Sequence, residues 1–388
     1  MHVGMITADL GVPVFGHKGG SVHVQEIVRA FLRHGASVHL FTASPGGLPP
    51  PDLQSIAVTI LPSVANDKAA PSATVASPAS VDAFNQQLLA QMEGQAMARG
   101  FDLIYERYSL WSFAAMTYAK KRGIPGIIEV NAPLIHEQNA YRTPIDTALA
   151  LSIAHRAFAS ADALIAVSEE VASYLEAFPG SHGKVHVIPN GADPLRFRES
   201  TVVPTAREFT VGFVGSLKPW HGVNLLVDAF GMFQSRFRDS RLKIVGQGPE
   251  EGRIKEQVSR QGLASAVDFA GAVSPKDVPR HLAEMHIGVA PYPDLPEFYF
   301  SPLKLFEYMA AALGVVASNI GQIPRVVEHG VTGWLTPAGD ALRLADALAQ
   351  LRSQPALRCR MGKAAREKIC REHNWDLIVA RILALAKS

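Results

Sequence analysis

Short runs of β-forming residues alternate with longer segments of helical period along almost the whole chain, and this alternation restricts the possible folds most strongly. In the first half the β-rich runs lie at Val3–Ile6, Val38–Thr42, Leu103–Tyr105, Ile127–Val130, Leu164–Val167 and Val185–Ile188. In the second half they lie at Thr210–Val214, Leu242–Val245, Val267–Phe269, Ile287–Ala290 and Val315–Ala317. Such alternation is typical of parallel sheets covered by helices on both faces. The sequence therefore predicts an α/β fold with two parallel sheets.

The length of 388 residues allows two or three domains, since one domain takes roughly 150 residues. Turn-forming residues at Pro189–Pro194 follow the last strand of the first half and mark a boundary. Apolar residues at helical spacing predict an amphipathic helix at Trp375–Leu385, and the Pro-, Ala- and Ser-rich stretch 62–80 is predicted to be a surface loop. We expect two domains facing a cleft and a terminal segment, at 1–192, 193–371 and 372–388.

Charge and cysteine content exclude several classes of function. The chain has 37 Lys and Arg against 35 Asp and Glu, so no strong global field favours nucleic acid. Cys359 and Cys370 lie eleven residues apart on a predicted helix, too far to bond, which indicates reduced thiols. The N-terminal residues do not resemble a signal peptide, and no apolar stretch is long enough to span a bilayer. We expect a cytoplasmic protein.

Contact with the inner face of the membrane is an alternative left open by two basic groups. Lys120, Lys121 and Arg122 form one, and Arg236, Arg238 and Arg241 form the other. Either group could rest on an anionic membrane, or each could be a solvated helix face.

Glycine-rich turns between strands and helices are the first candidate binding elements. Gly16–Ser21, which includes Gly19 and Gly20, opens the first helix, where free amides attract anions. A plain tight turn is the alternative. The spaced GxGxxG fingerprint is missing, which argues against a nicotinamide-dependent oxidoreductase.

Two similar turns lie in the second half of the chain. Gly215–Gly222 supplies Lys218 as a fixed cation, His221 as a titratable donor and Gly215 for close backbone approach, a set that suits phosphate oxygens. Gly246–Pro249 again follows a strand and precedes a helix. Such loops cluster at the carboxyl ends of parallel strands.

The run Phe298–Ala311 is the third candidate. Pro302 fits the first turn of a helix, so the amides around Ser301–Lys304 form an anion site. Glu307 lies further along that helix and would accept two sugar hydroxyls, or it forms a salt bridge. Together these turns indicate one polyanionic ligand, and a nucleotide diphosphate is the simplest choice.

In the first half, Glu106-Arg107-Tyr108 ends one strand and Glu129–Pro133 ends the next, so both point to the ligand side of the sheet. They are candidates for the acceptor side of a site. The alternative is that Glu106 and Arg107 pair with each other or cap a turn. No Asp-X-Asp, HExxH or paired CxxC motif occurs, so no metal site and no cofactor are predicted.

In this order and spacing, the runs resemble the retaining glycosyltransferases of family 4, which have the GT-B fold. The resemblance rests on Gly19-Gly20, Val187–Asp193, Gly215–Gly222, Gly246–Pro249, Ser301–Ala311 and Ile323–Gly333. It implies two Rossmann-like domains, with a nucleotide-sugar donor on the C-terminal one and an acceptor on the N-terminal one. The final helix would cross back to the first domain.

The resemblance also implies roles for single residues. Glu307 would bind the ribose hydroxyls, and Lys218 with the amides around Ser301, Leu303 and Lys304 would hold the diphosphate. Gly19 and Gly20 would approach the phosphates or the transferred sugar. The remaining positions of the implied donor site are Gly248 and Val273, the latter beside the base.

The chain departs from the family's pattern at several positions. Tyr299 stands where the family has the first of two glutamates, eight positions before Glu307. Ser216 and His221 stand where it has an arginine and a lysine, so Lys218, aided by Lys304, is expected to supply the charge. Asn131 lies where related enzymes carry a histidine near the sugar, with His136 nearby. Ala312 and Gly314 replace a Gly and a Pro.

These expectations combine into a metal-independent transfer of a hexosyl unit from a UDP- or GDP-linked sugar, with retention. Lys218, Glu307 and Asn131 are the expected catalytic residues. The acceptor is a glycan, a lipid-linked sugar or a small molecule, in polysaccharide biosynthesis; the sequence carries no signal of oligomeric state. A sugar-nucleotide epimerase of the same fold and a catalytically impaired glycosyltransferase-like subunit are the alternatives.

Overall fold

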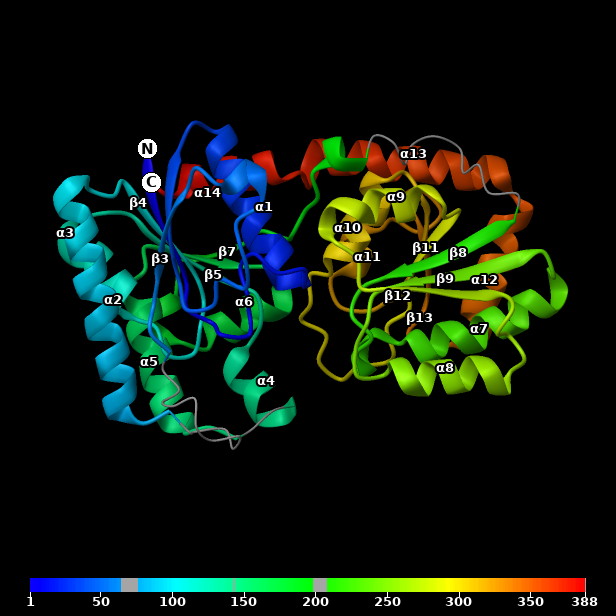
Figure 1. The fold of residues 1–388 in the computed structure, drawn as a ribbon, viewed down its shortest axis with the longest axis horizontal. Helices are drawn as coiled ribbons and strands as arrows, with labels where there is room; N and C mark the ends of the chain where they lie inside the picture. The colour runs from blue at the N-terminus through cyan, green and yellow to red at the C-terminus, as the bar shows by residue number, and fades with distance from the viewer. Residues whose placement is uncertain (64–75, 142–143, 198–207, 388) are drawn as a thin grey trace. The chain divides into compact units, whose positions relative to one another are not determined.

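The computed structural model describes residues 1–63, 76–141, 144–197 and 208–387. These residues form two compact units, Met1–Pro189 with Asp376–Ser388, and Asn190–Trp375 (Figure 1). The chain leaves the first unit at Pro189, three residues before the expected boundary at 192. It returns to that unit at Asp376, whereas the sequence placed the change at 372.

In the described residues, the first unit has a sheet of seven strands in the order β3-β2-β1-β4-β5-β6-β7. Each strand pairs with its neighbours in parallel, as the alternation of strands and helices predicts. The strands are β1 (His2–Thr7), β2 (Ser37–Thr42), β3 (Ala57–Ile60), β4 (Leu103–Arg107), β5 (Gly126–Val130), β6 (Ala163–Ala166) and β7 (Val185–Val187).

Helices cover this sheet on both sides. In Figure 1, α2, α3 and α5 are stacked along one face, and α1 lies on the other, where Phe31 packs edge-on against Tyr105 of β4. Helix α14 is tied to the end of α1 by an ion pair between Arg33 and Asp376. The helices are α1 (Gly19–Arg33), α2 (Pro78–Ala98), α3 (Ala114–Arg122), α4 (Leu134–Tyr141), α5 (Thr147–Ser160), α6 (Glu169–Glu176) and α14 (Trp375–Leu385).

The second unit has a parallel sheet of six described strands in the order β10-β9-β8-β11-β12-β13. They are β8 (Phe209–Val214), β9 (Ser240–Val245), β10 (Val267–Gly271), β11 (Ile287–Ala290), β12 (Gly314–Asn319) and β13 (Trp334–Pro337). The helices are α7 (Val223–Arg236), α8 (Glu251–Arg260), α9 (Val278–Ala283), α10 (Leu303–Ala310), α11 (Ile323–Val326), α12 (Ala341–Ser353) and α13 (Pro355–Glu372).

Two separate apolar cores lie on the two faces of this second sheet. One joins alternate strand residues to α7, α8 and α12, and the other joins the intervening strand residues to α9, α10, α11 and α13 (Figure 1). Strands buried on both faces read as continuous apolar runs, which is why the central strands could be found in the sequence.

Two edge strands and one helix start differ from the prediction. β3 and β13 were not predicted, because both are short, partly exposed and lack a continuous apolar run. Helix α2 begins at Pro78, inside the predicted loop 62–80, because the hydroxyl of Ser77 caps the helix by accepting from the amide of Ser80. Residues 64–75 of that loop lie outside the described residues.

Three arginines of the two basic groups lie near acidic side chains. Arg241 pairs with Glu208, while Arg236 and Arg122 lie 3.9 Å from Asp346 and Glu93. None of the helices in the described ranges has the length and apolar character to cross a bilayer. Cys359 and Cys370 are free and exposed on α13, as expected.

Ala312, in the turn between α10 and β12, has a φ of 56°, a left-handed conformation that favours glycine. This is the position where the resemblance implies a glycine. We predict that Ala312→Gly raises the free energy of unfolding by about 1 kcal/mol, because the strain of a Cβ in this region is removed.

The neighbouring Ala311 is the matched control, since its φ of −77° suits any residue. There, Ala311→Gly should lower stability by about 1 kcal/mol. Urea unfolding of both variants measures the difference, and equal losses would contradict the strain at Ala312.

Candidate functional site

The crevice where the strand order reverses is the first place to look for a ligand in an open parallel sheet. In the second unit this point lies between β8 and β11, and in the first unit between β1 and β4. The loops that follow these strands contain most of the residues that the sequence singles out.

Three loops of the second unit touch one another closely through glycines. Gly222 has a φ of 65°, and a Cβ there would lie 1.8 Å from the carbonyl oxygen of Pro291, in the loop after β11. A Cβ on Gly246, in the loop after β9, would lie 1.9 Å from the carbonyl oxygen of Gly215. A Cβ on Gly248 would lie 2.4 Å from the carbonyl oxygen of Leu217. Only glycine allows these approaches.

Lys304, in the first turn of α10, is a buried cation that lies beside these loops. The residue is 7% exposed, and its Nζ has no hydrogen-bond partner among the residues that the structure describes. Nζ lies 4.1 Å from the ring centre of Phe213, and a methyl group on Gly215 would stand 3.1 Å from it. Burial lowers the pKa of Lys304 to about 7, although the nearby Glu307 carboxylate acts in the opposite direction.

His221 lies near Lys304, and its hydrogen-bond partner determines which ring nitrogen carries the proton. Its Nδ1 lies 2.5 Å from the carbonyl oxygen of Ser216, which can only accept, so Nδ1 carries the hydrogen. Burial, Lys304 and Lys218 lower the pKa of His221 to about 3, against an opposing effect of the Ser216 carbonyl. The neutral ring offers Nε2 as an acceptor. This state does not fit the predicted role of His221 as a donor to phosphate.

Lys218 and the start of α10 complete the polar side of this region. Lys218 is half-buried, with its Nζ 5.5 Å from the ring centre of Trp220. Helix α10 begins at Leu303, directly after Pro302, and no side chain caps its first amides. Glu307 is half-buried one turn further along.

Other predicted donor-site residues have structural contacts. The hydroxyl of Ser301 accepts from the amide of Asn190 at 3.0 Å, and Asn190 Nδ2 donates to the Ser301 carbonyl at 2.7 Å. Tyr299 is 5% exposed and packs against Phe300, with ring centres 4.4 Å apart. Val273 is half-buried against the second core. Through its two hydrogen bonds with Asn190, Ser301 also anchors the first residue of the second unit.

In the first unit, Arg107 lies at the end of β4 within a buried polar chain. Its Nη1 donates to His23 Nδ1 at 3.2 Å, and His23 Nε2 contacts Glu129 Oε1 at 2.8 Å. Tyr105 donates its hydroxyl to Glu129 Oε2 at 2.7 Å. Sequence reasoning missed His23, Tyr105 and this use of Glu129. The signal available in the sequence was that these polar residues lie within apolar runs.

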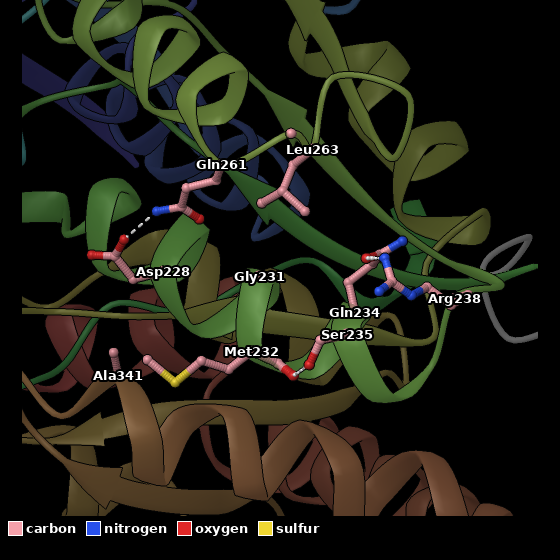
Figure 2. Close-up of a pocket in the computed structure, with 10 residues that line it drawn as sticks. Asp228, Gly231, Met232, Gln234, Ser235, Arg238, Gln261, Leu263 and Ala341 are labelled. Carbon is pink, nitrogen blue, oxygen red and sulfur yellow. Dashed lines mark hydrogen bonds between the residues drawn. The ribbon is translucent and has the colours of Figure 1, made fainter.

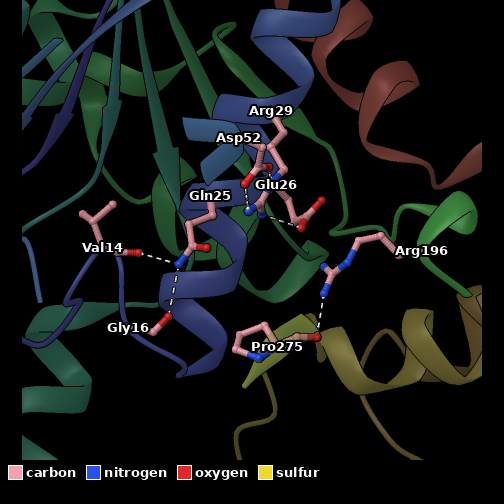
Figure 3. Close-up of polar contacts among 8 residues, drawn as sticks. All are labelled: Val14, Gly16, Gln25, Glu26, Arg29, Asp52, Arg196 and Pro275. Carbon is pink, nitrogen blue, oxygen red and sulfur yellow. Dashed lines mark hydrogen bonds and ion pairs between the residues drawn. The ribbon is translucent and has the colours of Figure 1, made fainter. Parts of the chain in front are cut away.

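The glycine-rich turn before α1 lies beside Arg107. A Cβ on Gly20 would stand 3.7 Å from Arg107 Nη2. Gln25 holds the turn by donating from Nε2 to the carbonyls of Val14 at 2.8 Å and Gly16 at 3.1 Å (Figure 3).

The other predicted residues of the first unit lie differently. Glu106 is 1% exposed and points to the opposite face of the sheet from Arg107, because side chains alternate along a strand. The alternative that Glu106 pairs with Arg107 is therefore wrong, whereas an acceptor contact of Glu106 stays a prediction. Burial raises its pKa to about 7. Asn131 is half-buried, with Nδ2 enclosed and unpartnered, and His136 is exposed, with its ring 5.4 Å from that of Tyr174.

A separate depression of about 580 Å³ lies on the second unit, between the later turns of α7, the turn after α8 and the start of α12 (Figure 2). None of the residues predicted to bind donor or acceptor lines it, although Arg238 of the second basic group does. Its polar side chains bond to nearby groups, as Gln261 does to Asp228 at 2.6 Å and Ser235 to the Met232 carbonyl at 2.7 Å. The polar side chains of the depression are therefore hydrogen-bonded, unlike the Nζ of Lys304 at the strand ends.

Comparison with known proteins gives matches over both units. Residues 17–196 match the family described as Glycosyltransferase Family 4, and residues 208–354 match Glycosyl transferases group 1. The phosphatidyl-myo-inositol mannosyltransferase of Mycobacterium leprae is 35% identical over 175 residues, which cover 45% of this chain. That match also spans only 45% of the Mycobacterium leprae protein.

Two further proteins are similar over nearly their whole length. The D-inositol 3-phosphate glycosyltransferase of Gordonia bronchialis is 26% identical over 401 residues, 97% of this chain and 86% of that protein. The Anabaena protein Alr3699/HepE, solved in complex with UDP and glucose, has a TM-score of 0.71 at 20% identity, covering 100% of this chain and 99% of that one. The chain therefore has the GT-B fold and belongs to family 4 of the glycosyltransferases.

Proposed function

We propose that this chain transfers a hexosyl unit from a UDP- or GDP-linked sugar to a glycan, a lipid-linked sugar or a small molecule. The observation that carries the proposal is Lys304, a buried cation without a hydrogen-bond partner at the strand-order reversal of the second unit. A desolvated ammonium gains much from a matching anion. A diphosphate is an anion of suitable size and charge.

The relatives support this class of reaction. The Mycobacterium leprae and Gordonia bronchialis proteins are named for transfer to phosphatidyl-myo-inositol and to D-inositol 3-phosphate, and the Anabaena protein was solved with UDP and glucose. We extend from them to this chain a nucleotide-linked donor and a hydroxyl-bearing acceptor.

The residues of the second unit have distinct parts in the proposed mechanism. As the bond from sugar to phosphate breaks, negative charge grows on the leaving diphosphate. Lys304, Lys218 and the uncapped amides of α10 would stabilise that charge. Glu307 would accept hydrogen bonds from the two ribose hydroxyls, which aligns the donor. This arrangement needs no metal ion for charge neutralisation.

Retention is the second element of the proposed mechanism. The acceptor hydroxyl would attack the anomeric carbon from the side that the diphosphate leaves, and its proton would pass to a departing phosphate oxygen. We assign no covalent nucleophile to the protein.

The function is tested with purified chain, UDP- and GDP-sugars and a panel of glycan, glycolipid and small acceptors. Wild-type protein should release the nucleotide diphosphate together with a glycosylated product. Lys218→Ala and Glu307→Ala should each lower kcat/KM about 100-fold, because each removes a contact to the leaving nucleotide. Lys363→Ala and Glu367→Ala, at exposed positions on α13, are the matched controls.

Other products would point to the alternatives. An epimerised sugar nucleotide formed without acceptor would indicate an epimerase. Donor binding without turnover would indicate an impaired subunit, which Tyr299 and Ser216 make worth testing. Wild-type turnover by both Lys218→Ala and Glu307→Ala would contradict the assigned site.

Metal independence predicts that excess EDTA leaves the rate of transfer unchanged. The lysines and helix amides, rather than a divalent ion, would carry the leaving-group charge. The rate is measured before and after chelation, and a loss that Mg²⁺ or Mn²⁺ restores would refute this part of the mechanism.

The lowered pKa of Lys304 predicts a pH dependence of nucleotide binding. Below about pH 7 the amine is charged and binds the diphosphate fully, and above that pH the charged fraction falls by about tenfold per unit. UDP or GDP affinity should therefore decline between pH 7.5 and 9, where phosphate, with a second pKa of about 6, is already fully ionised.

Titration calorimetry across this range separates the two titrating partners. In Lys304→Met the affinity should be weak and independent of pH. A decline of equal slope in the variant, or constant affinity in the wild type, would show that Lys304 does not contact the diphosphate.

A further inference from the structure

Arg107 occupies the strand-order reversal of the first unit, between β1 and β4. In the sheet, Thr7 lies beside Arg107, and Arg107 lies beside Glu129. Side chains in register on parallel strands point to the same face. Three polar side chains from three strands therefore meet under the start of α1.

The buried chain behind Arg107 fixes both its charge and its direction. An arginine can only donate, so His23 Nδ1 is the acceptor, and the ring proton lies on Nε2, which donates to Glu129. Burial acts to raise the pKa of Glu129, but His23, Arg107 and Tyr105 together lower it below its usual value. Glu129 is thus an ionised carboxylate, and it holds Arg107 through His23.

Arg107 keeps most of its hydrogen-bonding capacity unused. A guanidinium has five N–H donors. In the described residues, Arg107 uses one of them for its hydrogen bond to His23. Its Nη2 lies toward Gly20, where no Cβ intervenes, at a helix start without a side-chain cap. A residue that merely balanced the charge of Glu129 would contact the carboxylate directly.

A second polar group at the same place also lacks a partner. Thr7 is fully buried, and within the described part of the chain its hydroxyl oxygen has no hydrogen-bond partner. An unpaired buried hydroxyl is costly. A ligand oxygen between Thr7, Arg107 and the first amides of α1 would satisfy the hydroxyl, the free guanidinium donors and the uncapped helix together.

We propose that Arg107 binds a phosphate group in the first unit, with His23, Glu129 and Tyr105 as positioning residues. This inference rests on the proposed function for the origin of the phosphate, which belongs to the acceptor or to the donor. The fork of the guanidinium, with one nitrogen on His23 and the other free, suits a phosphate better than an ammonium would.

The test uses the full chain, with inorganic phosphate as the probe in titration calorimetry. The donor site is first saturated with UDP or GDP, so that phosphate cannot enter the second unit. Arg107→Gln should lower phosphate affinity at least tenfold, and Arg107→Lys should fall between it and the wild type. Arg99→Gln, at an exposed position of the same unit, is the control.

Separate arms identify the source of the phosphate. Loss of phosphate binding with unchanged nucleotide affinity assigns the site to an anionic acceptor. A tenfold loss of UDP or GDP affinity in Arg107→Gln assigns it to the donor diphosphate. If neither affinity differs from the Arg99→Gln control, the proposal is overturned.

The positioning role has its own readout. Glu129→Gln keeps Arg107 but removes the charge behind it, so phosphate affinity should fall several-fold while the His23 ring nitrogens change their NMR shifts. An unchanged affinity with changed shifts would leave Glu129 a purely structural role and would overturn that part of the proposal.

Failure of the proposed function is separable from failure of this inference. If no nucleotide binds, phosphate is titrated into Lys304→Met with and without Arg107→Gln. A difference between these two variants supports the Arg107 site whatever the donor is, and its absence overturns it.

Discussion

The burial of a positive charge at the carboxyl edge of a parallel sheet is the constraint on which the second unit depends. Lys304 has its ammonium near Phe213, Tyr292 and Gly215, and no group in the described ranges accepts a hydrogen bond from it. The loops around it can approach so closely only because Gly222 and Gly246 lack side chains. Burial, together with the nearby charge of Lys304, lowers the pKa of His221 and keeps its ring neutral. The ligand site is thus made by desolvation as much as by charge.

The two units accommodate a buried or half-buried positive charge in different ways. A lysine can release its proton, and burial brings the pKa of Lys304 to about 7. An arginine cannot do so. Arg107 is instead balanced by the ionised Glu129 through the neutral ring of His23. Each unit therefore has a positively charged side chain at the point where its strand order reverses.

The sequence allowed the positions of the buried strands along the chain and the location of the loops to be predicted, because both depend on local patterns. It did not reveal the partners across the sheet. The alternation of side chains along β4 separates Glu106 from Arg107, and the register of β4 with β5 brings Arg107 beside Glu129. His23 lies in helix α1, 84 residues before Arg107 in the sequence. The stronger burial of Lys304 over Lys218 likewise follows from packing that no local pattern records.

The chain of Arg107, His23 and Glu129 has an evolutionary consequence. Loss of Glu129 would leave the arginine uncompensated, loss of Arg107 would leave a buried carboxylate without its cation, and loss of His23 would disconnect the two. These positions lie on three different elements, so one mutation cannot replace the set. Relatives should therefore inherit or lose the three residues together.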